Sequence, residues 1–208
     1  MKLYIAPGAC SLSPHIVLEE SGLKYEWEKI DAKNKTVASG DYFKINPKGQ
    51  VPALQLDNGK VLTEGTAIVQ YIADLAPDKN LIPKFGTWER YKAIEWLNYI
   101  ATEIHKGFGP MWGAARIFKD NDASKQQMLS FAANMLDAKM TWMSSQLQSN
   151  SYLMGNQFTV SDAYLFTCLR WSKSVNFDLT KYPVLMGFME KVENRPAVQK
   201  VLKVEGLV

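Results

Sequence analysis

Two short runs of aromatic and apolar residues near the start of the chain are typical of β-strands. One run covers residues 2–5, and another covers residues 25–30, where aromatic and apolar side chains recur at every second position. Between them lies a helical segment that Ser11 or Ser13 can cap and that Gly22 can end, because glycine readily adopts a left-handed conformation. The chain therefore begins as strand, helix, strand.

A hairpin and a second helix follow an irregular middle segment. Residues 51–56 and 60–63 are strand-like, and they flank an Asn-Gly pair, the strongest short hairpin signal, because both residues tolerate positive φ angles. A helical pattern comes next over residues 66–75 and stops before a proline. This order of elements predicts an α/β domain over residues 1–78.

Strand patterns disappear in the rest of the chain. Residues 79–87 contain proline, glycine and other turn formers without periodicity, so we expect a linker there. Helical periodicity then predicts an all-helical domain over residues 88–208. The expected helices are 88–106, ending at Gly107; 124–147; 161–175, with Thr159 and Asp162 as a capping box; and 183–194, with a break at Pro196.

Composition and charge narrow the class of ligand. A chain of 208 residues with 47% hydrophobic content can give each of two modest domains its own core. The 24 basic and 21 acidic residues are spread along the chain, so the sequence predicts no nucleic-acid partner. No segment approaches the ~20 apolar residues of a membrane span, and no signal peptide is recognisable. We expect a cytoplasmic protein without a membrane partner that acts on a small molecule.

The two cysteines suggest different roles. Cys10 and Cys168 match neither a disulfide framework nor, with the two histidines, a metal cluster, so no metal is expected. Cys10 lies between a strand and a helix start, where free amides and the helix dipole would lower the pKa of its thiol. A buried structural cysteine is the alternative interpretation. Cys168 lies in an apolar helical run and is expected in the core.

The spacing from Cys10 to Ser13 resembles a redox Cys-x-x-Cys motif in which the second thiol has become a hydroxyl. No internal disulfide can close in such a motif, so the chemistry would need an external thiol. Ser13 could equally be a helix cap, and the spacing alone decides nothing.

Two further segments have features of a site for a peptide-like ligand. If the bond before Pro52 is cis, the backbone of Val51 turns outward to pair with such a ligand; a trans proline on an edge strand is the alternative. Glu64, Gly65 and Thr66 place a carboxylate and free amides at a helix start. Glu64 suits a ligand ammonium and the amides suit a ligand carboxylate, although a capped helix explains the same segment.

Several motifs, in their order and spacing, resemble the beta-class bacterial glutathione S-transferases over essentially the whole chain. The resemblance implies a thioredoxin-like α/β domain with a cis bond before Pro52, an all-α second domain, and a homodimer. It also implies glutathione as co-substrate, bound where domains and subunits meet, and a small hydrophobic electrophile as second substrate. The motifs lie at residues 9–11, 46–54, 62–65, 94–99, 103–108 and 158–163.

The resemblance assigns the chemistry to two residues and gives others contacts with glutathione. Cys10 matches the active-site cysteine, and His105 matches the histidine near the sulfur; helix geometry also places His105 on one face with Asn98. Further matches are Ala9, which precedes the cysteine, and Asn98, Glu103 and Lys106, which correspond to residues that approach the glutathione of the partner subunit.

The resemblance also distributes glutathione along the first domain. Val51, which precedes Pro52, matches the residue whose backbone pairs with the cysteinyl part of glutathione. Glu64 and Gly65 match the pair that binds the γ-glutamyl end. Many relatives have serine in place of Gly65, so only the backbone amide is available here. Lys35 corresponds to the residue that contacts the glycyl carboxylate.

The predicted reaction is attack of the glutathione thiolate, stabilised near Cys10 and His105, on an electrophilic carbon, which would serve detoxification and stress protection. A mixed disulfide between Cys10 and glutathione would instead favour thiol-disulfide exchange or peroxide reduction. Residues 111–118 depart from the family pattern and carry aromatic and methionine side chains that suit an apolar electrophile, a dimer contact or the core.

Two hypotheses from other classes are a glutathione-dependent binding protein without turnover, and a stress or transcription partner that kept the fold and lost the chemistry. The presence of Cys10, Glu64 and His105 together argues against the second.

Overall fold

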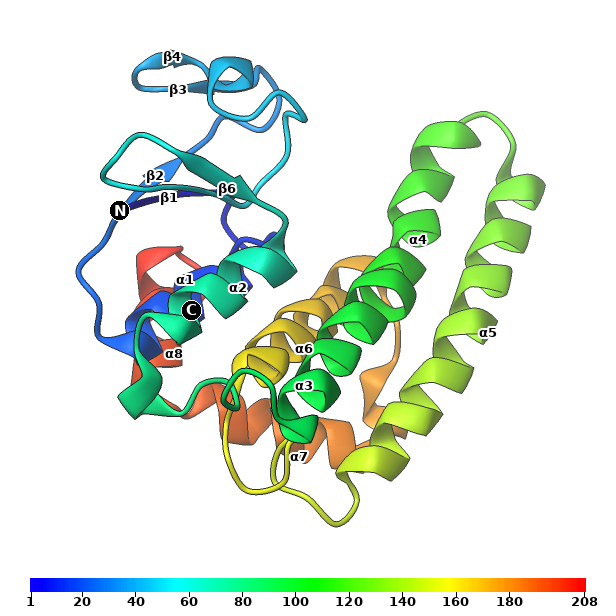
Figure 1. Cartoon of the computed structure of the whole chain (residues 1–208). Coiled ribbons are helices and arrows are strands. Elements are labelled where there is room, and N and C mark those ends of the chain that lie inside the picture. Colours follow the sequence, from blue (N-terminus) through cyan, green and yellow to red (C-terminus); the bar gives the residue numbers. More distant parts are fainter.

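A four-stranded sheet forms the centre of the N-terminal domain (Figure 1). The computed structural model describes residues 1–208 apart from the side chain of residue 115. The strand order is β2-β1-β5-β6, with β1 parallel to β2 and antiparallel to β5, and with β5 antiparallel to β6. The strands are β1 (Lys2–Ile5), β2 (Glu26–Lys29), β5 (Ala53–Gln55) and β6 (Val61–Thr63).

Side chains of β1 alternate between the two faces of the sheet. Leu3 and Ile5 are fully buried in the main core, together with apolar side chains of α1 (Leu12–Ser21) and α2 (Gly65–Asp74). Tyr4, between them, belongs to a smaller cluster with Tyr42. Helices therefore cover one face, and the middle segment of the chain covers the other. This confirms the predicted thioredoxin-like α/β arrangement.

The irregular middle segment contains two short strands, β3 (Thr36–Val37) and β4 (Gly40–Asp41), and a 3-10 turn, η1 (Tyr42–Lys44). These two strands form a second, two-stranded sheet, and Thr36 of β3 also bridges to Asp31. A further 3-10 turn, η2 (Pro77–Lys79), follows α2 and leads to the helical domain.

The second domain is helical, as predicted, and its first helices form an arm that rises opposite the sheet (Figure 1). The arm consists of α3 (Trp88–Tyr99), a π-helical turn η3 (Ile100–His105), α4 (Lys106–Ile117) and the antiparallel α5 (Asp122–Leu147). No helix formed by the described residues is long and apolar enough to cross a membrane. The remaining elements are α6 (Val160–Arg170), η4 (Trp171–Val175), η5 (Leu179–Lys181), α7 (Pro183–Glu193) and α8 (Pro196–Val204).

The predicted end of the helix at Gly107 is wrong. The chain passes through η3 and continues helically to Ile117. A Cβ atom on Gly107 would lie 2.9 Å from a methyl group of Leu136 on α5. Gly107 therefore allows α4 and α5 to pack closely, and this use of glycine cannot be distinguished from a helix end in the sequence.

Two other helix predictions need correction. The α-helical part of α6 ends at Arg170, and residues 171–175 form a 3-10 turn. The break at Pro196 is also the start of α8, because proline fits the first turn of a helix, where no amide partner is needed. α8 packs beside α1 and carries the C-terminal segment back to the sheet domain (Figure 1).

The capping box at the start of α6 is confirmed. The amide of Thr159 donates to Asp162 Oδ2 at 2.8 Å, and the amide of Leu153 donates to Oδ1 at 2.8 Å. All three residues are buried. Asp162 therefore fixes both the helix start and the loop before it.

Candidate active site

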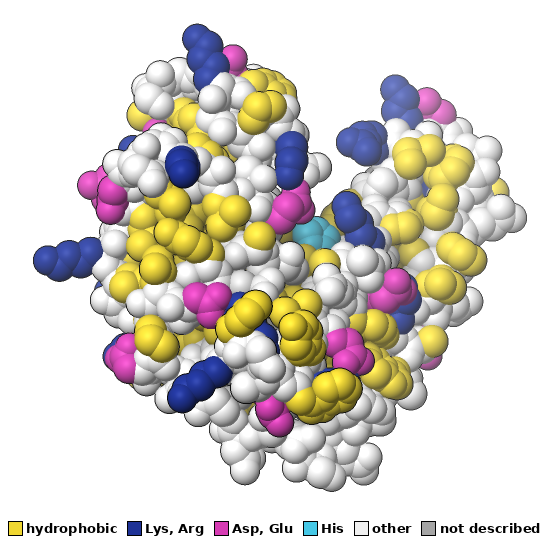
Figure 2. All heavy atoms as spheres, in the orientation of Figure 1, with side chains coloured by type: hydrophobic (Ala, Val, Ile, Leu, Met, Phe, Trp, Pro, Cys, Tyr) yellow, Lys and Arg dark blue, Asp and Glu magenta, His cyan; other side chains and the backbone are white. Residues whose placement is uncertain are grey.

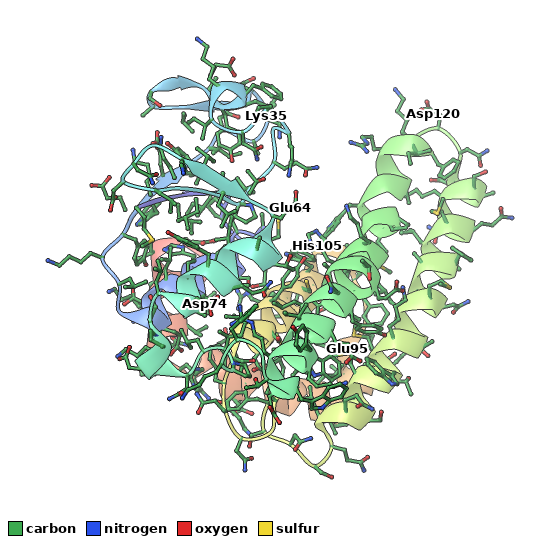
Figure 3. All side chains as sticks on the ribbon, in the orientation of Figure 1. Lys35, Glu64, Asp74, Glu95, His105 and Asp120 are labelled. Carbon is green, nitrogen blue, oxygen red and sulfur yellow. The ribbon has the colours of Figure 1, made fainter. Side chains whose placement is uncertain are left out.

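A cavity of about 410 Å³ lies between the N-terminal domain and the inner side of the helical arm. Figure 2 shows a hollow between the two lobes, with a histidine at its base and lysine or arginine side chains along its sides. In Figure 3, Lys35 and Glu64 come from the sheet domain, and His105 lies across from Glu64 on the helical arm. Nine of the predicted site residues line the cavity: Ala9, Cys10, Lys35, Val51, Pro52, Glu64, Gly65, His105 and Lys106.

Cys10 lies just before α1, and its thiol donates a hydrogen bond to the Val51 carbonyl oxygen at 3.1 Å. Burial raises the pKa of the Cys10 thiol to about 11, although the amides of Cys10 and Ser11 act in the opposite direction. The predicted lowering of this pKa is therefore wrong. The position at the helix start was correct, but the loss of hydration outweighs the amides there.

The loop that carries Cys10 is fixed by contacts at both ends. Ser11 Oγ accepts from the Ala6 amide and donates to the Ala6 carbonyl, both at 3.1 Å, so its hydroxyl closes the loop and does not cap the helix. The amide of Gly8 donates to Glu205 Oε2 at 2.9 Å, and Trp171 Nε1 donates to the Gly8 carbonyl at 2.8 Å. The C-terminal segment and the helical domain thus hold this loop in place.

The Val51-Pro52 peptide bond is cis, as the peptide-binding hypothesis requires. The preceding turn is held by Gln50, whose carbonyl accepts from the Tyr42 hydroxyl at 2.9 Å and from Asn46 Nδ2 at 2.6 Å. Val51 is half-buried at the cavity wall. Its backbone is therefore held by residues of the motif that pointed to this site.

Glu64 adopts a left-handed φ of 71°, which is unusual for a residue with a side chain. Its carboxylate is 66% exposed and contacts Lys48 Nζ at 2.5 Å, and Lys48 also donates to Thr63 Oγ1 at 3.0 Å. Lys48 was not predicted as a site residue. The only signal was its place in the motif around Pro52, because only the fold brings it to Glu64.

The charged residues of the cavity favour an anionic ligand. Lys35, Lys48 and Lys106 line it, against a single glutamate, Glu64. Cations in a recess attract anions more strongly than the net charge of a whole protein would suggest. The one carboxylate, close to the free amides at the start of α2, still leaves a position for a ligand ammonium.

His105 is a neutral group at physiological pH. Burial, assisted by the charge of Lys106, lowers the pKa of its imidazole to about 4. Its Nδ1 and the Tyr164 hydroxyl share a hydrogen bond of 2.7 Å, and its ring packs against Trp171. A base with so low a pKa removes protons poorly near pH 7, so the imidazole of His105 is suited to hydrogen bonding more than to proton removal.

Asn98 and Glu103 do not line the cavity of this chain. Asn98 is exposed on α3, and Glu103 pairs with Lys139 of α5 at 2.9 Å. Lys139 lowers the pKa of the Glu103 carboxyl group. Their assignment to the site of a partner subunit therefore stays a prediction.

An aromatic cluster continues from His105 along the arm. Trp171 contacts His105 with ring centroids 4.7 Å apart and Trp112 with centroids 5.1 Å apart. Phe108 is fully buried behind them, whereas Trp112 is 42% exposed. Within the segment 111–118, Met111 and Ala114 are buried, whereas Trp112 and Ile117 are exposed.

Binding of a metal ion requires several ligating side chains in one place. Among the described residues, no group of three or more histidine, cysteine, aspartate or glutamate side chains is arranged to hold a metal ion.

Comparison with known families accounts for both domains. Residues 1–74 match the family described as "Glutathione S-transferase, N-terminal domain", and residues 111–205 match "Glutathione S-transferase, C-terminal domain". The chain belongs to the glutathione S-transferase family of enzymes, which confirms the resemblance in the sequence.

Individual relatives place it among the bacterial, beta-class members. Glutathione S-transferase GstA of Escherichia coli O157:H7 is 45% identical, with full coverage of both chains. The solved ternary complex of BphK, a bacterial enzyme of this family, is 47% identical, with full coverage of both chains and a TM-score of 0.92. The beta-class enzyme of Sphingomonas chungbukensis is 39% identical, again with full coverage, and its structure matches with a TM-score of 0.90.

Proposed function

We propose that the cavity binds glutathione and that the enzyme transfers the glutathione thiolate to small hydrophobic electrophiles, in detoxification and stress protection. The observation that carries the proposal is that one cavity brings together Cys10, Val51, Glu64, Gly65 and His105 from separate segments of the chain. A sphingomonad relative, 38% identical with a TM-score of 0.90, was solved in complex with glutathione.

The charges of the cavity suit glutathione, which has two carboxylates and one ammonium. Glu64 and the free amides at the start of α2 fit the α-amino acid end, and Lys35 fits the glycyl carboxylate. The backbone of Val51 supplies an amide and a carbonyl for the cysteinyl peptide groups. Each polar part of the tripeptide thereby has a complementary group, and its sulfur points toward Cys10.

The protein contributes mainly positioning and stabilisation of charge. The amides that precede α1 face the position of the sulfur, where they favour a thiolate over a thiol. The neutral imidazole of His105 can hydrogen-bond to the sulfur without repelling an electrophile. Trp171 packs against His105 and Trp112 packs against Trp171, so an apolar electrophile that contacts these rings would lie on the His105 side of the sulfur.

Thiol-disulfide exchange is a second candidate function, favoured by the location of Cys10 in the cavity. In that reaction the Cys10 thiolate attacks the sulfur of a mixed disulfide, and the leaving thiolate takes up a proton from water. A relative in Escherichia coli K12, 25% identical over 96% of this chain, is a disulfide-bond oxidoreductase. Glutathione-dependent peroxide reduction would use the same cysteine.

A homodimer completes the proposal. Phe131, Met135 and Trp142 of α5 are exposed at spacings that place them along one side of the helix, and Trp142 packs on Tyr99 of α3 with ring centroids 4.5 Å apart. A row of exposed large apolar side chains of this kind is typical of a subunit interface. Asn98 lies on α3 beside this surface, where it could reach a partner's site.

The test is a steady-state panel that pairs glutathione with an aryl halide, an organic hydroperoxide and a mixed disulfide. Conjugation to the aryl halide that survives in Cys10→Ala supports the first function. Activity confined to the hydroperoxide and the mixed disulfide, and abolished in Cys10→Ala, would support the second. A folded enzyme that turns over none of the three substrates would overturn both.

A further inference from the structure

The hydroxyl of Ser13 is a buried polar group with no role in the proposed function. Its residue is 2% exposed, and its Oγ atom has no hydrogen-bond partner among the described residues. His15 Nε2 and Arg90 Nε share this condition, but of the three residues only Ser13 lines the cavity. A buried hydroxyl without a partner is costly, so such a group at an active site points to an interaction formed in another state.

Ser13 lies one turn after Cys10. The Ser13 amide donates to the Cys10 carbonyl at 3.3 Å, which closes the turn between them. Side chains three residues apart on such a turn are neighbours on one face. This hydrogen-bonded turn predicts that the hydroxyl of Ser13 and the sulfur of Cys10 lie on one side of the helix start.

The contact of Cys10 with Val51 suits only the protonated thiol. An S–H group can donate to the Val51 carbonyl at 3.1 Å, but a thiolate has no proton to donate and faces the negative end of that carbonyl. On ionisation the sulfur must exchange this acceptor for donors. The nearby donors are the amides of Cys10 and Ser11, which already favour the thiolate, and the free hydroxyl of Ser13.

We propose that Ser13 is a further catalytic residue, whose hydroxyl donates a hydrogen bond to the sulfur of Cys10 when that sulfur is a thiolate. The protonated thiol of Cys10 donates to the Val51 carbonyl. When the thiol loses its proton to water, the Cys10 side chain rotates about χ1 and the sulfur moves toward Ser13. This inference rests on the proposed function in so far as Cys10 supplies the reacting sulfur. On this proposal, the serine at the fourth position of the Cys-x-x-Ser segment, Ser13, stabilises the Cys10 thiolate.

The test is the rate at which iodoacetamide alkylates Cys10 between pH 7 and pH 9, read by peptide mass analysis so that Cys168 is counted separately. Below the pKa, the rate at a fixed pH follows the thiolate fraction. Loss of one charge-assisted hydrogen bond should raise the pKa by about one unit. A pKa higher by about one unit lowers the thiolate fraction about tenfold, but the thiolate of a less acidic thiol is also more nucleophilic. Cys10 in Ser13→Ala should therefore be alkylated about threefold to tenfold more slowly than in wild type at each pH.

Two matched variants accompany the alanine change. Ser13→Thr keeps a hydroxyl and should retain most of the wild-type rate. Ser161→Ala removes a buried hydroxyl that bonds to the Ala93 carbonyl, far from Cys10 in the chain, and should leave the rate unchanged. Equal rates in wild type and Ser13→Ala, or an equal loss in Ser161→Ala, would overturn the proposal.

A third variant tests the geometry even if Ser13→Ala folds poorly. In Ser13→Cys, two thiols would stand one turn apart, and added diamide should accept two electrons and two protons as a disulfide forms with Cys10. The protein mass should fall by about two hydrogens. A folded variant that stays reduced under diamide would show that the two side chains do not meet, and the proposal would fail.

Glutathione does not enter these measurements, so their failure is separate from a failure of the proposed function. Calorimetry with S-methylglutathione, which cannot form a disulfide, tests glutathione binding, on which the proposed function depends. Ser13→Ala should bind it with an affinity within about twofold of wild type, because the hydroxyl acts on Cys10. A larger loss of affinity would assign Ser13 to ligand binding and contradict its action on the thiolate.

Discussion

A serine at position 65 should improve glutathione binding, because the cavity has room for the hydroxyl that Gly65 lacks. Gly65 is the first residue of α2 and lines the cavity next to Glu64. A Cβ atom there would lie 3.6 Å from Pro52 Cγ and 3.9 Å from Pro52 Cδ, which are ordinary van der Waals distances. Its φ is not positive, so a side chain adds no backbone strain there. Gly65→Ser should therefore be accepted without rearrangement.

The magnitude follows from one added hydrogen bond. A serine hydroxyl at the start of α2 can donate to the carboxylate of the γ-glutamyl end, and such a bond contributes a net gain of about 1 kcal/mol. This corresponds to a Kd about fivefold lower. Replacing glycine in the first turn of the helix should also raise the free energy of unfolding by roughly a few tenths of a kcal/mol.

Isothermal titration calorimetry of wild type, Gly65→Ser and Gly65→Ala separates the two effects. The alanine variant adds the same Cβ atom without a hydroxyl, so it should share the gain in stability and keep the wild-type Kd. If Gly65→Ser binds glutathione no better than Gly65→Ala, the γ-glutamyl carboxylate does not lie at the start of α2. The orientation assigned to glutathione would then be wrong.

Three further predictions concern the reactive thiol, a helix start and the histidine. Alkylation at neutral pH should label Cys10 before Cys168, because Cys168 is fully buried and burial raises its pKa well above the ordinary value; faster labelling of Cys168 would contradict this. Asp162→Ala should lower the free energy of unfolding in urea by about 2–4 kcal/mol, because two buried amides lose their acceptor, and a loss near zero would refute that reasoning. His105 has a folded pKa of about 4, below its unfolded value, so its contribution to stability is present above pH 6.5 and is lost as pH falls toward 4. His105→Gln should therefore lose less Tm than wild type between pH 7 and pH 5, and an equal loss would contradict the lowered pKa.

The elements of the fold were readable from local patterns because each pattern had a local cause. The short β-prone run of β1 is apolar at three consecutive positions because both faces of the strand are covered, with Leu3 and Ile5 toward the helices and Tyr4 toward the other cluster. The capping box at Thr159 and Asp162 is likewise a contact within four residues. Such signals require no knowledge of distant contacts.

The features that the sequence did not reveal depend on long-range packing. Gly107 looks like a helix end, and only its distance to Leu136 of α5 shows that it permits close contact between helices. Lys48 reaches Glu64 only because the fold brings together segments 16 residues apart. The pKa of Cys10 was predicted in the wrong direction because helix-start amides are visible in a sequence, whereas the extent of burial is not.

Calorimetric titration of the folded enzyme with glutathione, at concentrations up to the millimolar range, tests whether this cavity binds glutathione. We expect saturable binding that weakens in Glu64→Gln, because the ligand ammonium loses a charged partner. Glu190→Gln removes an exposed carboxylate of α7 that does not line the cavity, and it serves as the matched control in the same chain. No detectable binding by a folded sample, or binding that is indifferent to Glu64, would show that glutathione does not bind as proposed.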